Sequence, residues 1–248
     1  MLRFLMIGQS NMAGRGTMGM LPAIVNDRVR VYWNGEWRPA AEPVNPDRSF
    51  SGESMQLPFA DIVQRATGED VGLIACAEGG TLLRQWAPGG GLFTRAVAAA
   101  RATAGEGPLS AILWIQGEND GYSLENAGAY SGRFLAMLDA LTAELELTEK
   151  VPVIIAELCP FLDEYNRQVP PEQRVPYWCT IAAQQRQLPL LRSNIRCVSS
   201  EGLEGKPDGI HYDTPALREL GRRFAEMYIT EFRKEGDCTR AVNVIGRC

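Results

Sequence analysis

The chain has 248 residues, of which 45% are hydrophobic and 22% charged, a composition ordinary for a soluble globular protein with a large core. The net charge of −5 gives no electrostatic footprint for nucleic acid or for an anionic membrane. No apolar run approaches the roughly 18 residues of a membrane span. We therefore expect neither a nucleic acid nor a membrane partner, and a single domain over residues 1–248.

The first residues, 1–7, are apolar, but the run is too short for the apolar region of a signal peptide. It leads directly into a polar motif that belongs inside a fold, so we interpret it as the first strand. A chain without a visible leader is expected in the cytoplasm. Secretion is the alternative if a leader has been removed ahead of residue 1.

Short apolar runs alternate along the chain with longer segments of helical periodicity. The runs are rich in Val, Ile and Leu without polar alternation, which is typical of strands buried on both faces of a parallel sheet. The predicted strands are residues 2–7, 71–75, 111–115, 151–156 and 195–198, and the predicted helices are residues 57–67, 92–104, 124–145, 177–187 and 215–234. This alternation predicts an α/β fold, a three-layer α/β/α sandwich around a parallel sheet of about five strands.

Two segments depart from this alternation. Residues 28–37 alternate in polarity around Asn34-Gly35, a strong turn signal, and predict a small hairpin after the first strand. Residues 160–176, with several prolines and mixed charges, are predicted to form a long surface loop.

The six cysteines are widely spaced and show no zinc-binding pattern, so we expect no metal site. Cys76, Cys159 and Cys197 end apolar runs and are expected to be buried free thiols. Cys238 and Cys248 bracket a short polar tail, and they could either stay free or pair in an oxidising compartment.

Polar or glycine-rich sequence follows several of the predicted strands, at the sheet edge where functional groups gather in open α/β folds. Gly8-Gln9-Ser10 follows the first strand and could present the Ser10 hydroxyl and N–H at a helix start. The alternative is that Ser10 or Asn11 only caps that helix. Gly79-Gly80 follows the second strand, where one amide could face an oxyanion or simply complete a turn.

The third strand leads into Gln116-Gly117-Glu118-Asn119-Asp120, a cluster that is costly to bury without partners. Gln116 or Asn119 could donate a side-chain N–H to an oxyanion, and Glu118 or Asp120 could anchor loops. The only histidine of the chain, His211, follows Asp208 by three residues around a glycine turn. The carboxylate could fix the imidazole tautomer, as in Ser-His-Asp hydrolases, although a surface histidine beside a helix cap is the alternative.

Together these segments resemble the SGNH hydrolase superfamily, and within it the branch of carbohydrate esterase family six and the sialate O-acetylesterase-like proteins. The resemblance rests on four blocks that occur in the family's order: Gly8-Gln9-Ser10-Asn11-Met12-Ala13-Gly14, Gly79-Gly80-Thr81 with Trp86 following, Gln116-Gly117-Glu118-Asn119-Asp120, and Asp208-Gly209-Ile210-His211. The segment Leu82-Leu83-Arg84-Gln85-Trp86 is more apolar and bulky than that branch leads us to expect.

The resemblance implies a flavodoxin-like sandwich and an acetylesterase that needs no metal or other cofactor. At the matching positions Ser10 is the nucleophile, His211 the general base and acid, and Asp208 the residue that orients His211. The oxyanion hole would combine the amides of Ser10 and Gly80 with the side chain of Gln116, or alternatively of Asn119. The expected substrate-binding residues are Gln9, Arg84, Trp86 and Glu118, with Trp33 and Trp37 as further candidates that could instead pack within the hairpin.

The expected reaction removes acetyl groups from an acetylated carbohydrate, such as acetylxylan or an O-acetyl sialic acid, through an acetyl-enzyme. A second hypothesis keeps the catalytic residues but takes a lipid, a thioester or a small aryl ester as substrate. A third is a carbohydrate-binding protein without activity. The presence of Ser10, Asp208 and His211 together argues against the third hypothesis.

Overall fold

The computed structural model describes residues 1–147 and 151–233 of the chain. Seven strands form one sheet in the order β3-β2-β4-β1-β5-β6-β7. All neighbouring strands run parallel except β2 and β3, which are antiparallel. The strands are β1 (Leu2–Gly8), β2 (Val29–Trp33), β3 (Glu36–Pro39), β4 (Val71–Ala75), β5 (Leu109–Ile115), β6 (Val153–Ala156) and β7 (Ile195–Val198).

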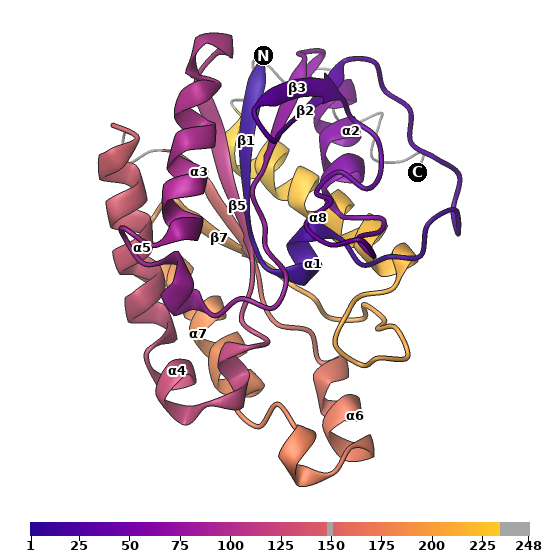
Figure 1. Cartoon of the computed structure of the whole chain (residues 1–248), viewed down its shortest axis with the longest axis vertical. Helices are drawn as coiled ribbons and strands as arrows, with labels where there is room; N and C mark the ends of the chain where they lie inside the picture. The colour runs from indigo at the N-terminus through magenta and orange to yellow at the C-terminus, as the bar shows by residue number, and fades with distance from the viewer. Residues whose placement is uncertain (148–150, 234–248) are drawn as a thin grey trace.

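Helices cover both faces of this sheet (Figure 1). One face carries α2 (Gln56–Thr67) and α8 (Thr214–Phe232), and the other carries α3 (Gly91–Ala102), α5 (Tyr130–Glu144) and α7 (Trp178–Leu191). The short helices α1 (Ser10–Ala13), α4 (Leu124–Gly128) and α6 (Phe161–Gln168) lie towards the edge where β1 ends. The predicted three-layer α/β/α sandwich is thereby confirmed.

The central strand β1 divides its side chains between two apolar cores. Phe4 and Met6 point into the core on the α2–α8 side, whereas Leu5 and Ile7 point into the core on the opposite side. All four side chains are at most 1% exposed. Burial on both faces explains why residues 4–7 are a continuous apolar run, because these four positions have almost no contact with water.

The five predicted strands are all present, although β6 begins at Val153, two residues later than predicted. The predicted hairpin also forms, with Asn34 and Gly35 at φ of 52° and 92° in its turn. Its first strand, β2, pairs in parallel with β4, so the hairpin extends the main sheet. The sheet therefore has two strands more than we expected.

The predicted helix over residues 124–145 is divided into α4 and α5 at Ala129. The side chain of Gln184 explains the break. Its amide nitrogen donates to the Ala127 carbonyl at 2.6 Å, and its amide oxygen accepts the N–H of Ser131 at 2.9 Å. In a continuous helix those two backbone groups would bond to each other, so Gln184 takes the place of one helical hydrogen bond.

The prediction of a long irregular loop over residues 160–176 was wrong, since the segment contains α6 and a short 3₁₀ turn at Pro171–Gln173. Leu162 is 1% exposed and anchors α6 to the apolar core. Helix α7 also continues through Pro189 to Leu191, beyond its predicted end. In both places the burial of an apolar side chain in the core, Leu162 in α6 and Leu188 in α7, outweighs the local turn signals.

Burial raises the pKa of the thiols of Cys76, Cys159 and Cys197 to about 12, as expected for free structural cysteines. Cys76 and Cys159 are buried, and Cys197 is half-buried. Cys238 and Cys248 lie outside the described residues. Among the helices of residues 1–147 and 151–233, none has the length and apolarity needed to cross a bilayer.

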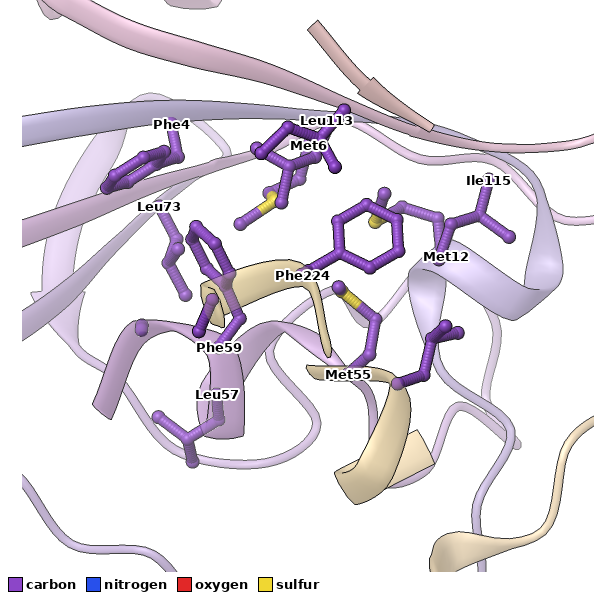
Figure 2. Close-up of a cluster of buried hydrophobic side chains, with 14 of the residues drawn as sticks. Phe4, Met6, Met12, Met55, Leu57, Phe59, Leu73, Leu113, Ile115 and Phe224 are labelled. Carbon is purple, nitrogen blue, oxygen red and sulfur yellow. The ribbon is translucent and has the colours of Figure 1, made fainter. Parts of the chain in front are cut away.

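Replacing Phe224 with alanine is expected to lower the free energy of unfolding by about 3–5 kcal/mol, because removal of a buried aromatic ring leaves a cavity in the core. The Phe224 ring is fully buried among α2, α8 and the sheet (Figure 2). Urea denaturation measures the change. The same substitution at Phe50, whose ring is 69% exposed, should cost under about 1 kcal/mol. Equal losses for both variants would contradict this account of the core.

Candidate active site

The chain turns sharply at the carboxyl end of β1, and the turn depends on Gly8. This residue has a φ of 133°, and a Cβ at its position would lie 2.1 Å from the Ile115 carbonyl oxygen of β5. The N–H of Gln9 donates to that same oxygen at 2.9 Å. Because only glycine permits this close approach, the next residue, Ser10, begins a helix directly beside the end of β5.

Ser10 therefore lies at a switch point of the sheet. From β1 the chain first builds β2, β3 and β4 on one side, and then β5, β6 and β7 on the other. The loops that leave neighbouring strands separate in opposite directions at such a point and leave a crevice, where open α/β sheets bind their ligands. Three of the polar blocks identified in the sequence follow β1, β4 and β5 at this edge.

His211 connects the other two predicted catalytic residues. Its Nε2 lies 3.0 Å from the Ser10 Oγ, and its Nδ1 lies 3.0 Å from the Asp208 Oδ2. The Ser10 side chain belongs to a residue only 5% exposed, whereas the side chains of His211 and Asp208 are 25% and 42% exposed. The structure thus brings the three predicted residues together in the order needed for serine nucleophile activation.

The Asp208 carboxylate is held ionised. Burial alone would raise its pKa, but hydrogen bonds from the His211 ring and from the N–H groups of His211 and Ile210 hold the pKa well below its usual range. The two backbone N–H groups donate to Oδ1 at 2.9 and 3.0 Å, which leaves Oδ2 for the imidazole. This arrangement fixes a proton on the Nδ1 of His211, so that Nε2 can accept one from Ser10.

The Asn11 side chain sets the position of the loop around His211 relative to Ser10. Its amide oxygen accepts the N–H of Tyr212 at 3.2 Å, and its amide nitrogen donates to the Ile210 carbonyl at 3.1 Å. The same nitrogen donates to the Glu118 carboxylate at 2.5 Å. Asn11 thereby holds the backbone on both sides of His211, and its side chain does not cap α1, whose N-cap residue is Gln9.

Glu118 lies beneath the site, because it is only 3% exposed. Its pKa is raised because burial outweighs the opposing effects of the Asn11 hydrogen bond and the His211 charge. In the described part of the chain, its Oε2 has no hydrogen-bond partner. The expectation that Glu118 contacts substrate directly is therefore wrong in this structure, since the carboxylate does not reach the surface.

Gln116, our favoured oxyanion donor, is fully buried, and both hydrogens of its amide nitrogen are engaged. They point to the Thr81 carbonyl at 3.0 Å and to the Asp120 carboxylate at 2.6 Å. Asp120 also accepts the N–H of Leu83 at 2.9 Å. Gln116 therefore supports the loop after β4 from below and has no amide hydrogen left for a ligand.

Asn119 occupies a different position, half-buried at the mouth of the site. Its amide nitrogen donates one hydrogen to the Gly80 carbonyl at 2.8 Å and retains a second. Gly80 itself has a φ of 77°, and no atom of the described residues lies within 4 Å of where its Cβ would be. The alternative oxyanion side chain and the predicted oxyanion glycine are thus neighbours.

The remaining residues predicted to bind substrate differ in their exposure to solvent. Arg84 is exposed, whereas Gln9 and Trp86 are each 1% exposed. The Trp86 ring packs edge-on against Trp114 with centroids 5.5 Å apart, so the ring is buried and the expectation that it binds substrate is wrong in this structure. Gln9 lies beneath the site, where its side-chain oxygen accepts a hydrogen bond of 3.4 Å from the N–H of Gly117.

Trp33 and Trp37 are half-buried in the packing of the hairpin, the alternative foreseen for them. Trp37 lies edge-on to Tyr32, with the two ring centroids 5.5 Å apart. Both tryptophans therefore serve the fold of the hairpin.

Sequence reasoning missed a buried support for the turn after β4. The carboxylate of Asp47 pairs with Arg15 through two bonds of 2.8 and 2.9 Å and accepts the N–H of Gly79 at 2.8 Å. The side chain of Asn45 bonds both backbone groups of Ala77, at 2.9 and 3.1 Å. A segment that had no recognisable motif thus holds the proposed oxyanion loop in place.

Comparisons with known proteins agree with this fold. A family model described as carbohydrate esterase, sialic acid-specific acetylesterase matches residues 2–230. A "Probable carbohydrate esterase" of Arabidopsis thaliana is 29% identical over 257 residues, covering 92% of this chain and 90% of that protein. The crystal structure of an Arabidopsis thaliana protein matches with a TM-score of 0.82 at 27% identity, covering 94% of this chain and 99% of that one. NanS shares the fold, with a TM-score of 0.73 at 14% identity over 92% of this chain and 96% of its own.

The parallel sheet and these matches define an SGNH-like carbohydrate esterase, which confirms the resemblance found in the sequence. More narrowly, the chain belongs to the family of sialic acid-specific acetylesterases among the carbohydrate esterases. It is accordingly a carboxylic ester hydrolase.

Replacing Trp86 with phenylalanine is expected to reduce the free energy of unfolding by about 1–3 kcal/mol. The change removes a hydrogen bond from the indole Nε1 to Thr81 Oγ1, 3.2 Å long, and opens space against Trp114. The KM for an ester substrate should stay within about twofold, because the ring does not reach the crevice. Thermal or urea denaturation and steady-state kinetics measure the two effects. A raised KM with unchanged stability would show that the ring contacts substrate.

Proposed function

We propose that this protein is a serine carbohydrate O-acetylesterase in which Ser10 attacks the acetyl group. The observation that carries the proposal is the position of His211, 3.0 Å from both the Ser10 hydroxyl and the Asp208 carboxylate. Proton transfer needs a base within hydrogen-bond reach of the nucleophile, and that base must be held in one tautomer. Both requirements are met by side chains from opposite ends of the chain.

In the first half of the reaction, the Ser10 Oγ attacks the acetyl carbonyl carbon while His211 Nε2 takes the hydroxyl proton. A tetrahedral intermediate forms with its negative charge on the former carbonyl oxygen. As that intermediate collapses, the bond to the sugar oxygen breaks and His211 returns the proton to it. The products of this step are a free sugar hydroxyl and an acetyl group on Ser10.

In the second half, His211 takes a proton from water, whose oxygen attacks the acetyl carbon. The second tetrahedral intermediate releases acetic acid, which loses its proton to solvent, and His211 gives its own proton back to the Ser10 oxygen. Asp208 stays ionised throughout, because its hydrogen bonds outweigh burial and lower its pKa. Its charge stabilises the imidazolium that exists in both halves of the reaction.

The oxyanion in this proposal is bound by the N–H groups of Ser10 and Gly80 and by the side-chain amide of Asn119. The Ser10 N–H belongs to the first turn of α1, where N–H groups have no acceptor within the helix. Within residues 1–147 and 151–233 the Gly80 N–H also meets no acceptor. Asn119 takes the role that we first gave to Gln116, since only Asn119 has an amide hydrogen to spare.

The proposed substrate is an acetylated sugar of the acetylxylan or O-acetyl sialic acid type. Support comes from the family, whose description names carbohydrate esterases and sialic acid-specific acetylesterases. The exposed Arg84, in the loop after β4, is the side chain that we expect to contact the sugar or its carboxylate. A comparison of kcat/KM for acetylated sugars with that for long-chain and thioester substrates decides between this and the other hydrolase hypotheses.

Hydrolysis of 4-nitrophenyl acetate should fall by about 10³-fold or more in both Ser10→Ala and His211→Ala. In the wild type, kcat/KM should decline towards acid pH with the slope of a single proton. His211 accepts a proton only when neutral, whereas the lowered pKa of Asp208 keeps that carboxylate ionised over the same range. Initial rates between about pH 5 and 9 measure the profile.

His211 is the only histidine, so no other imidazole can replace it in the variant. Wild-type activity in His211→Ala would therefore disprove the proposed mechanism. An inert wild type would favour the carbohydrate-binding hypothesis instead.

Replacing Asn119 with alanine should lower kcat by about 10²- to 10³-fold with little change in KM, as for other oxyanion donors. Gln116→Ala should lower kcat by less than about tenfold and chiefly reduce the free energy of unfolding, since it leaves buried partners unsatisfied. Steady-state kinetics and urea denaturation of both variants measure this difference. The opposite ranking of the two kcat values would assign the oxyanion contact to Gln116.

A further inference from the structure

The peptide group between Gly79 and Gly80 is held from one side by an arginine. The Nη2 of Arg48 donates to the Gly79 carbonyl oxygen at 3.0 Å. In a trans peptide the carbonyl and the next N–H point in opposite directions. The N–H of Gly80 therefore points away from Arg48. The Gly80 carbonyl is held in turn by Asn119, so the peptide groups on both sides of Gly80 have fixed orientations.

The guanidinium of Arg48 is itself well anchored. Its Nη1 donates to the Asp47 carbonyl at 2.8 Å and also to the Glu78 carboxylate. Asp47 in turn accepts the Gly79 N–H through its carboxylate, which is fully buried and paired with Arg15. Two successive residues thus bind the two ends of Gly79, one from the interior and one from the surface.

The turn that these residues hold lies next to the nucleophile. The N–H of Glu78 donates to the Gly8 carbonyl at 3.0 Å, so the segment begins beside the end of β1. Gly79 has no room for a side chain, because a Cβ would lie 2.3 Å from the Arg15 Nη2. The backbone therefore passes directly over the ion pair of Arg15 and Asp47, and Gly80 follows at the rim of the crevice.

We propose that Arg48 is a positioning residue that aims the Gly80 N–H at the oxyanion and strengthens it as a donor. A cationic group on the carbonyl oxygen of a peptide draws electron density from it and makes the N–H of the same peptide more positive. The role rests on the proposed function, in which Gly80 binds the oxyanion. Arg48 acts only through this peptide and does not touch substrate.

An alternative role for Arg48 is a surface ion pair with Glu78, and the chain contains a matched control for it. Arg95 also pairs with Glu78, at 3.0 Å, and the side chains of Arg48 and Arg95 are 40% and 42% exposed. The remaining bond of Arg95 goes to the Cys76 carbonyl, at 2.9 Å, rather than to Gly79. The two arginines thus pair with the same carboxylate and are equally exposed. They differ in the backbone carbonyl that each one binds, which is that of Gly79 for Arg48 and that of Cys76 for Arg95.

The test compares Arg48→Met and Arg95→Met in the full chain, using 4-nitrophenyl acetate. Loss of a whole oxyanion donor costs about 10²- to 10³-fold, but here the N–H remains and only its aim and polarity change. We therefore expect Arg48→Met to lower kcat about tenfold with KM within about twofold of wild type. Arg95→Met should stay within about twofold in kcat, and both variants should unfold at nearly the same urea concentration as the wild type.

Equal kcat values for the two variants would overturn the proposal, because loss of the Glu78 pair would then explain the effect. A rise in KM without a fall in kcat in Arg48→Met would also overturn it, since it would indicate a substrate contact. Ser10→Ala is assayed alongside. If Ser10→Ala kept its activity, the mechanism of Ser10 itself would fail, and that result is separate from any difference between the two arginine variants.

Discussion

The hydrogen bond between Ser10 and His211 joins segments 201 residues apart, and one buried amide keeps it at 3.0 Å. Asn11 directly follows Ser10, and its side chain bonds the backbone before and after His211. A neutral buried hydrogen bond contributes only about 1 kcal/mol net, but an unmade one costs more. The loop around His211 is therefore fixed relative to Ser10. If the loop moved, the Asn11 amide would lose its hydrogen-bond partners at a position that is only 1% exposed.

The floor of the crevice is made of polar groups that are expensive to bury. Gln116, Glu118 and Asp120 are at most 3% exposed, and one oxygen of each has no hydrogen-bond partner among the described residues. An interior with such groups is stable only when apolar burial elsewhere compensates for them. The two cores that β1 separates supply that burial, so the strand that leads to Ser10 also anchors the stabilising layers.

Much of this could be predicted from the sequence, because both the buried strands and the polar blocks after them are local signals. The fold class, the five parallel strands and the residues that we propose as catalytic follow from such signals. Whether a loop side chain faces the core or the solvent depends on contacts distant in the sequence. The burial of Trp86 and Glu118 was therefore missed. Gln184 and Asp47 act on segments 53 and 32 residues away, and no periodicity or motif connects them with those partners.

The antiparallel strand β3 has a consequence for the behaviour of the protein in concentrated solution. It forms one outer border of the sheet, where unpaired backbone groups can recruit a strand from another molecule. The strand has only four residues, carries the charged Glu36 and Arg38, and ends at Pro39, which has no N–H to donate. Shortness, charge and proline together discourage edge-to-edge aggregation, so the hairpin closes this side of an otherwise parallel sheet against self-association.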